Sequence, residues 1–147
     1  MPLPRPDSTR FDVDDGFRVV VQVPEAHAQR VIDAVLEADP LIYGDYDRVT
    51  FETAVGVQKF RALGTGRNAA TAATVAVPCS ELSFYVRCDE TSLARILDRI
   101  YWAHPYEEPV ILVMPALRCL HIRGQDEDNP NRFWNRPAED WIPSEHR

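Results

Sequence analysis

The sequence has few of the features that mark membrane, nucleic-acid-binding or secreted proteins. No apolar run approaches the roughly 18 residues that a membrane-spanning helix needs. With 16 Lys and Arg against 23 Asp and Glu, the net charge is -7, which argues against nonspecific binding to nucleic acid or to an anionic membrane surface. The N-terminal residues show no apolar segment of the secretory type. We therefore expect a cytoplasmic protein with neither a nucleic-acid partner nor a membrane partner.

Cysteine pairs and nucleophile motifs are missing as well. Cys79, Cys88 and Cys119 are widely spaced and none belongs to a Cys-x-x-Cys pair. Free, buried thiols are therefore favoured over a disulfide or a metal cluster. No Gly-x-Ser-x-Gly motif, the usual sign of a serine hydrolase, is present. A non-catalytic role is favoured, and an uncharacterised hydrolase is the more distant alternative.

The chain is long enough to fold around a core of its own. It has 147 residues, of which 45% are hydrophobic and 27% charged, as in ordinary soluble domains. Residues 1–15 contain three prolines and several aspartates, and they predict a flexible arm. We expect one folded domain over residues 16–123, followed by an irregular, proline-broken extension over residues 124–147.

Two kinds of periodicity alternate along this domain. Apolar and polar residues alternate in four segments, which we predict to be strands: residues 17–23, 49–57, 81–88 and 110–114. Apolar residues recur at helical spacing in two segments, which we predict to be helices: residues 24–38 and about 89–104. Residues 58–80 are small and polar and predict a long loop. The order strand, helix, strand, strand, helix, strand predicts a ferredoxin-like α+β fold, an antiparallel sheet with two helices on one face.

Apolar residues continue beyond the last predicted strand. A short apolar run covers residues 117–122, and Trp134 and Trp141 stand in an otherwise polar tail. A disordered tail would gain little from two tryptophans, whereas docking can bury a large apolar area with each. We therefore predict that residues 124–143 are ordered and pack on the domain or on a neighbouring subunit.

The stretch between the second predicted helix and the last predicted strand is the richest in reactive side chains. It runs from His104 to Pro109 as His-Pro-Tyr-Glu-Glu-Pro, and its prolines end the helix and impose a rigid turn. Imidazole and carboxylate groups suit zinc or copper(II), so His104 and Glu108 are candidate metal ligands. Tyr106 and Glu107 are candidate ligand-binding residues beside them. In the competing, structural interpretation, His104 caps the helix and the glutamates accept backbone hydrogen bonds.

A second polar stretch follows the first predicted helix. Tyr43, Asp45, Tyr46 and Asp47 surround a glycine before the second predicted strand. We predict that these four residues also bind the ligand, because this connection and the turn before the last strand can approach each other across a subunit boundary. The competing interpretation is an Asx-type turn whose carboxylates are solvated.

These two stretches resemble motifs of known families. Tyr-Gly-Asp-Tyr-Asp at residues 43–47, followed by Thr50 and Phe51, resembles a turn and strand of the PII-like insert domain in the NGG-interacting-factor-three family. The motif at residues 104–109 resembles the second signature of that domain. A similar His-Pro-Tyr-Glu-x-Pro element occurs in the CutA family of divalent-cation tolerance proteins. The resemblance spans about residues 17–115.

The resemblance implies a CutA/PII-like fold and assembly as a homotrimer. The insert domain usually carries a Pro-Leu-Glu-Gly type of run after its second strand, where residues 61–64 here read Arg-Ala-Leu-Gly. The two-metal domain that flanks the insert in full-length members has no counterpart, so the chain is similar to a stand-alone insert domain.

The implied function is non-catalytic binding. In the first version the protein holds a divalent metal ion, zinc or copper, in a cleft between subunits and serves metal homeostasis. In the alternative it senses a small metabolite or a nucleotide and acts through the predicted loop at residues 58–80.

Overall fold

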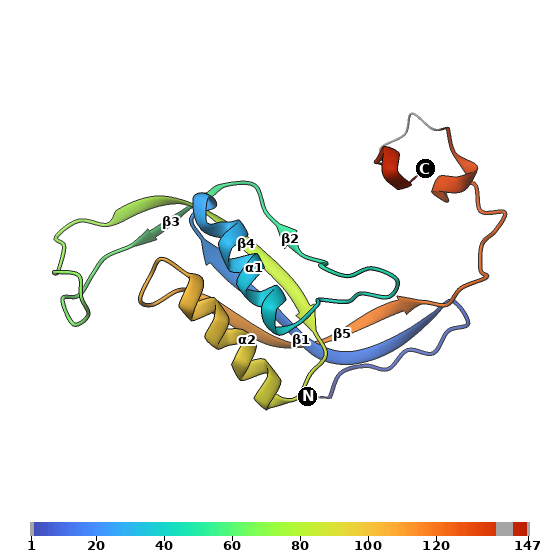
Figure 1. The fold of residues 1–147 in the computed structure, drawn as a ribbon, viewed down its shortest axis with the longest axis horizontal. Helices are drawn as coiled ribbons and strands as arrows, with labels where there is room; N and C mark the ends of the chain where they lie inside the picture. Colours follow the sequence, from blue (N-terminus) through green and yellow to red (C-terminus); the bar gives the residue numbers. More distant parts are fainter. Residues whose placement is uncertain (1, 138–142, 147) are drawn as a thin grey trace.

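The computed structural model describes residues 2–137 and 143–146, and it shows an antiparallel sheet covered on one face by two helices (Figure 1). The strands are β1 (Phe11–Val23), β2 (Phe51–Glu52), β3 (Gly56–Phe60), β4 (Val75–Val86) and β5 (Ile111–His121). The helices are η1 (Glu25–His27), α1 (Ala28–Ala38), α2 (Glu90–Ala103), η2 (Phe133–Asn135) and η3 (Ser144–His146). The predicted ferredoxin-like α+β fold is confirmed. Of the described helices, none is long and apolar enough to cross a membrane.

The sheet order is β2-β4-β1-β5, and β3 pairs with the first half of β4. In the middle of the sheet, Val21 lies between Leu82 of β4 and Ile111 of β5. Residues that oppose each other in register point to the same face, so alternate β1 residues face the helices. The centre of the core consists of side chains with almost no exposed surface: Val19, Val21, Val23, Val31, Val35, Leu82, Ile96 and Ile100.

Helix α2 begins and ends where its flanking residues require. The Asp89 carboxylate accepts a hydrogen bond from the Ser92 backbone N–H at 2.8 Å, which satisfies one of the free N–H groups of the first turn. At the other end His104 has extended backbone angles, as the residue before a proline favours. Both predicted helices are confirmed, because caps, prolines and apolar spacing are all local signals.

The first and last strands are longer than predicted. β1 begins at Phe11, which opposes His121, and Asp15 opposes Leu117. Residues 11–15, predicted to belong to the flexible arm, are therefore paired strand. β5 passes through Pro115, so the predicted strand and the apolar run after it are one element. Residues 11–15 contain three aspartates and give no strand signal of their own, so pairing with the apolar run of β5 is what makes them a strand.

The second predicted strand is broken and the predicted loop after it is mostly a hairpin. β2 contains only Phe51–Glu52, and β3 starts anew at Gly56. β3 pairs with the first residues of β4, so the connection shrinks from the predicted residues 58–80 to residues 61–74. Figure 1 shows this β3–β4 hairpin extending from one end of the sheet, beyond the helices.

The C-terminal segment does not pack against the helices. Figure 1 shows it turning away from the sheet at the end opposite the hairpin. The indole N–H of Trp134 donates to the Glu127 carbonyl at 3.1 Å, and its ring packs edge-on against Phe133. Asp126 ties the segment to the sheet through Arg10. The sequence predicted that Trp134 packs either on the domain of its own chain or on a neighbouring subunit. Packing on its own domain is not found, and packing on a neighbouring subunit stays a prediction. Trp141 lies outside the described residues.

Gly16 is required by the close approach of β4. A Cβ at this position would lie 2.3 Å from the Val86 carbonyl oxygen and 2.5 Å from the Tyr85 hydroxyl. We expect Gly16→Ala to lower the free energy of unfolding by about 1–3 kcal/mol, since the backbone must shift. Denaturant unfolding measures this loss. Gly66→Ala, which meets no atom within 4 Å, is the control, and an equal effect of both substitutions would contradict the prediction.

Candidate functional site

His104 is buried at the end of α2, only 6% exposed, and both of its ring nitrogens face backbone groups. Its Nε2 lies 2.7 Å from the Gln22 carbonyl oxygen, and its Nδ1 accepts a hydrogen bond from the Tyr106 backbone N–H at 3.0 Å. A nitrogen that accepts must carry a lone pair, so the proton resides on Nε2. Burial lowers the pKa of His104 and outweighs the opposing effect of the Gln22 hydrogen bond, which keeps the ring neutral at pH 7.

This geometry gives His104 a positioning role. It ties the turn at residues 104–109 to β1, and Tyr106 continues the contact toward the hairpin. The Tyr106 ring centroid lies 5.1 Å from that of His104 and 6.2 Å from that of Phe60. A metal ion at His104 would have to replace one of the two backbone hydrogen bonds.

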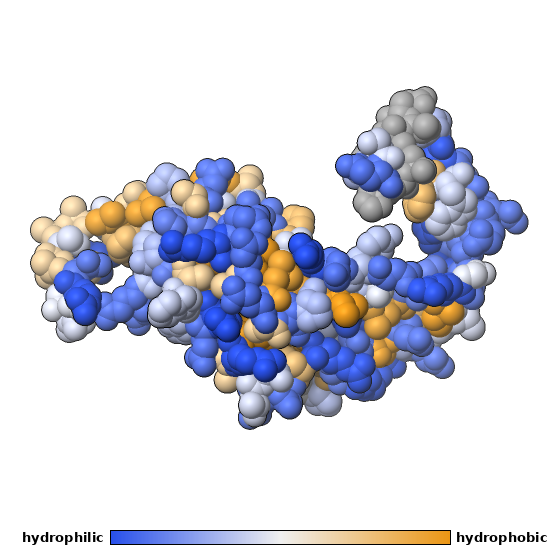
Figure 2. All heavy atoms as spheres, viewed as in Figure 1, coloured by the Kyte–Doolittle hydropathy of each residue, from blue (hydrophilic) through white to orange (hydrophobic). Residues whose placement is uncertain are grey.

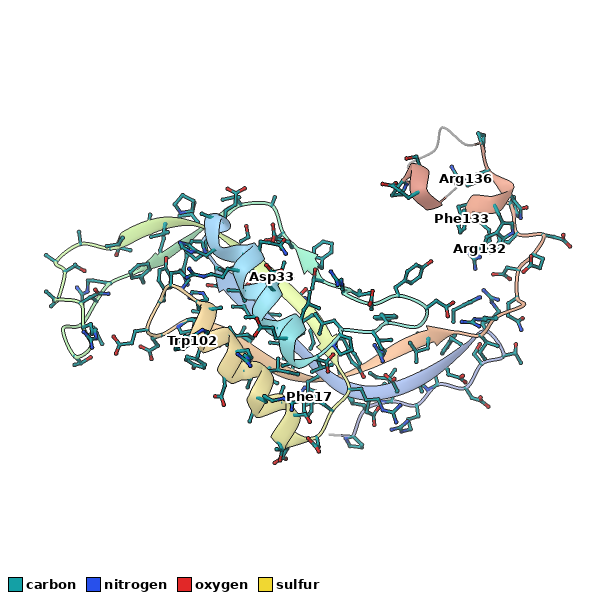
Figure 3. The ribbon with its side chains drawn as sticks, viewed as in Figure 1. Phe17, Asp33, Trp102, Arg132, Phe133 and Arg136 are labelled. Carbon is teal, nitrogen blue, oxygen red and sulfur yellow. The ribbon has the colours of Figure 1, made fainter. Side chains whose placement is uncertain are left out.

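The two glutamates of the 104–109 turn have exposed side chains. Glu107 and Glu108 both lie at the surface, and the indole of Trp102 on α2 is also exposed. Figure 3 shows Trp102 at the end of α2, where the chain leads into residues 104–109. Within the described residues, no three His, Cys, Asp or Glu side chains come close enough to hold a metal ion.

The second candidate stretch forms a tight turn. Tyr43 and Tyr46 exchange backbone hydrogen bonds of 2.7 and 3.1 Å, and Gly44 between them has a φ of 59°. Glycine adopts this conformation without steric cost, which explains its place in the motif. Asp45, Tyr46 and Asp47 are all exposed. Asp45 also pairs with Arg123, and the hydrogen bond from this arginine lowers the pKa of Asp45.

Arg118 holds this turn against β5. It donates to the Ile42 carbonyl at 2.9 Å, and its guanidinium carbon lies 4.9 Å from the centre of the Tyr43 ring. The Tyr43 hydroxyl in turn donates to the Cys119 carbonyl at 3.0 Å. Sequence reasoning missed Arg118, whose only sequence signal is a charge inside an apolar run.

A buried ion pair lies beneath the turn. Arg118 binds both oxygens of Asp14, at 2.8 and 3.2 Å, and the Tyr85 hydroxyl donates to the same carboxylate at 2.9 Å. Arg118 also stacks on the Tyr85 ring, with its guanidinium carbon 4.3 Å from the ring centre. Burial, together with the neighbouring Asp14 carboxylate, raises the pKa of Tyr85. Asp14, Tyr85 and Arg118 thus form a satisfied network that positions the 43–47 turn.

The two candidate stretches lie at opposite ends of β5. Residues 104–109 lead into its first residue, whereas the 43–47 turn contacts Cys119 near its last (Figure 1). From Ile111 to Cys119 the strand advances eight residues, about 26 Å at roughly 3.3 Å per residue. One chain therefore does not bring the two stretches together.

Solved structures with this arrangement of elements are known, although no protein-family model and no curated protein matches the sequence. A Bacillus cereus protein related to NIF3 is 25% identical over 71% of this chain, with a TM-score of 0.58. The divalent cation tolerance protein CutA1 of Thermus thermophilus is 17% identical over 70% of this chain and 84% of its own, with a TM-score of 0.51. CutA of Synechococcus elongatus is 20% identical over 73% of this chain and 85% of its own, again with a TM-score of 0.51.

The fold is that of CutA. The predicted relationship to CutA and to the NIF3-related proteins is confirmed at the level of the fold. The region that matches this chain covers only 26% of the length of the NIF3-related protein. The match to CutA extends over most of both chains.

The three cysteines of this CutA-like chain are free thiols, as predicted. Cys79 is buried and Cys88 half-buried, but Cys119 is exposed, so the prediction that all three are buried is wrong for Cys119. Burial raises the pKa of Cys79 and of Cys88, which keeps both thiols protonated at neutral pH.

Proposed function

We propose that the protein is a non-catalytic CutA-like homotrimer that binds a divalent metal ion, zinc or copper(II), in a cleft between subunits. This proposal is based on the separation of the two candidate stretches, which only a second subunit can bring together. Each stretch offers exposed carboxylates, Asp47 on one side and Glu107 and Glu108 on the other. In a ring of chains, the turn of one subunit faces the motif of the next, and the two stretches combine into one site.

The surface of the single chain supports association. Large apolar side chains are exposed on the hairpin, where Figure 2 shows a cluster of hydrophobic residues: Val57, Phe60, Leu63 and Val75. Phe51 and Leu112 are exposed on the sheet. Monomeric soluble proteins rarely expose so many neighbouring apolar groups, and the free edge of the long strand β5 also favours pairing with another chain.

The donor set consists mainly of oxygen atoms, and zinc accepts carboxylate oxygen as well as imidazole nitrogen. Glu107 and Glu108 supply carboxylates, with Asp47 and the phenol of Tyr46 from the neighbouring chain completing the shell. His104 joins this shell only if its bond to the Tyr106 N–H opens and frees Nδ1. The divalent cation tolerance named for the Thermus thermophilus protein adds support for a metal. Cytoplasmic residence belongs to the same proposal.

Light scattering at micromolar concentration tests the assembly, and calorimetric titration with zinc and copper(II) tests the site. We expect a trimer mass, and we expect Glu107→Gln with Glu108→Gln to weaken metal binding at least about tenfold, roughly 1.4 kcal/mol. Asp98→Asn, which removes an exposed carboxylate from α2, is the matched control. A monomer mass, or equal affinities of the double variant and the control, would refute the proposal.

A second candidate function is sensing of a small metabolite or a nucleotide. The projecting β3–β4 hairpin favours it, because a ligand at its base can change how the hairpin meets a partner. A thermal-shift panel of nucleotides and metabolites, run beside the metal titration, distinguishes the two functions.

A further inference from the structure

The face of the sheet that is turned away from α1 and α2 carries a row of apolar side chains. The neighbours of Val20 along β1 are fully buried under the helices, so Val20 points to the opposite face. There Val20 pairs in register with Leu112 of β5 and with Ser83 of β4, and Ser83 pairs with Phe51 of β2. Phe51 is 68% exposed and Leu112 is 50% exposed. The apolar row, which consists of Phe51, Val20 and Leu112, therefore leaves two large apolar groups facing water.

Opposite charges flank the apolar row. Arg18 lies two residues before Val20 on β1, and Glu81 lies two residues before Ser83 on β4, so both side chains point to the same face as the row. Because β4 runs antiparallel to β1, the two charges lie on opposite sides of the row. Both residues are exposed. The row is thus an apolar strip with a cation on one side and an anion on the other.

The aromatic segment, residues 126–136, presents two further exposed apolar side chains. Phe133 and Trp134 pack edge-on with 5.2 Å between their ring centroids, and they remain 42% and 46% exposed. The Trp134 indole N–H and the Asn135 side-chain amide both donate to the Glu127 carbonyl, at 3.1 and 2.8 Å. These hydrogen bonds fix the aromatic pair in place, and a docking element with a fixed conformation loses little entropy on binding.

The aromatic segment carries both signs of charge. Exposed acids lie at its start, and arginines flank the aromatic pair in the sequence: Glu127, Asp128, Arg132 and Arg136. Arg10 and Arg132 share the single carboxylate of Asp126, so this cluster keeps one positive charge. The acids and arginines of the segment therefore complement Arg18 and Glu81 beside the apolar row.

The aromatic segment cannot reach the apolar row of its own chain. The Ile122 N–H donates to the Arg10 carbonyl at 3.1 Å, and Asp126 pairs with Arg10, so the segment starts next to the first residues of β1. Leu112 lies ten residues before Ile122, about 33 Å at roughly 3.3 Å per residue. The connecting residues 123–125 span at most about 11 Å. Figure 1 shows the segment turned away from the sheet, where a second copy of the chain can offer its row instead.

We propose that the aromatic segment of one subunit docks on the apolar row of the next, with its aromatic pair against Phe51 and Leu112. This contact rests on the homotrimer of the proposed function and adds to it a surface on each side. Because the two surfaces differ, each chain gives one segment and receives another, and such contacts form closed rings when the rotation allows it. Tryptophan and arginine dominate the binding energy of many interfaces, and the segment places both side by side.

Disulfide trapping in the full-length chain tests the contact directly. Leu112→Cys with Trp134→Cys, in a Cys119→Ser background, should give covalent dimers and trimers on a non-reducing gel, because the two positions cannot meet within one chain. Val113→Cys with Trp134→Cys is the matched control, since Val113 is also exposed but points to the other face of the same strand. Absence of the cross-link through position 112, or an equal yield through position 113, overturns the proposal.

Charge reversal provides a second measurement, with light scattering on serial dilutions. Arg18→Glu should raise the protein concentration at which the trimer dissociates at least about tenfold, since it places like charges opposite each other. Adding Glu127→Arg and Asp128→Arg should restore the parent value. Asp33→Arg, which reverses an exposed acid on α1 (Figure 3), is the control and should restore nothing.

The two measurements separate this contact from the trimer itself. A parent trimer that dissociates at the same concentration as Arg18→Glu and gives no cross-link through position 112 would overturn the docking of the aromatic segment and leave the proposed function standing. A monomeric parent protein would refute both.

Discussion

Replacing Arg118 by alanine is expected to lower the free energy of unfolding by about 3–5 kcal/mol, because a buried carboxylate loses its hydrogen-bonded cation and keeps only the exposed Arg87, at 3.7 Å. The side chains of Asp14 and Arg118 are only 7% and 12% exposed, and both carboxylate oxygens are bound. The 43–47 turn should loosen as well, since Arg118 holds the Ile42 carbonyl. Denaturant unfolding followed by circular dichroism measures the loss.

Arg99→Ala is the matched control for this prediction. Arg99 pairs with Glu37 at 3.2 Å, but these side chains are 46% and 60% exposed, so the loss should not exceed about 1 kcal/mol. Adding Asp14→Asn to the Arg118→Ala variant should recover part of the stability, since it removes the buried charge that Arg118 no longer neutralises. Equal losses for Arg118→Ala and Arg99→Ala would show that the network does not stabilise the fold.

Acid should lower the stability of the parent protein more than that of the Arg118→Ala variant. Burial by itself would raise the pKa of Asp14, but hydrogen bonds from Arg118 and Tyr85 and the charges of Arg118 and Arg87 hold it below the ordinary value of 3.8. The parent protein therefore loses this stabilisation only as the pH falls below about 3.8 and through the lowered pKa. In Arg118→Ala the hydrogen bond and the charge of Arg118 no longer lower the pKa of Asp14, so this pKa should rise, and acid should narrow the difference in stability between the two proteins.

Replacing His104 by alanine should cost about 2–6 kcal/mol, because it leaves the Gln22 carbonyl and the Tyr106 N–H unpaired in a buried place, at about 1–3 kcal/mol each. His121→Ala, at an exposed position on β5, should change stability by no more than about 0.5 kcal/mol. Thermal and denaturant unfolding measure both effects. If His104→Ala is as stable as the control but loses zinc binding, His104 is a metal ligand and not a positioning residue.

Acid provides a further check on His104. Because burial lowers its pKa below 6.5, the unfolded chain binds a proton more readily than the folded one. The contribution of the neutral His104 ring to stability is therefore complete above pH 6.5, and it declines as the pH falls from there through the lowered pKa. The His104→Ala variant should lack this decline.

Local patterns in the chain were sufficient for much of the fold. The cap at Asp89, the prolines around His104 and the apolar spacing of both helices act on neighbouring residues, and the structure confirms each element they predict. The same holds for the tight turn at Gly44. Such signals are readable in sequence because the atoms that interact are a few residues apart.

Pairing between distant segments decided the rest. Asp14 and Arg118 are 104 positions apart, and only the β1–β5 register turns two charges in ordinary-looking segments into a buried pair. The same register extends β1 back to Phe11 and separates residues 43–47 from residues 104–109 within one chain. The break between β2 and β3 at residues 53–55 likewise exists only relative to β4. A strand has no register until its partner is in place, so these features follow from the tertiary structure alone.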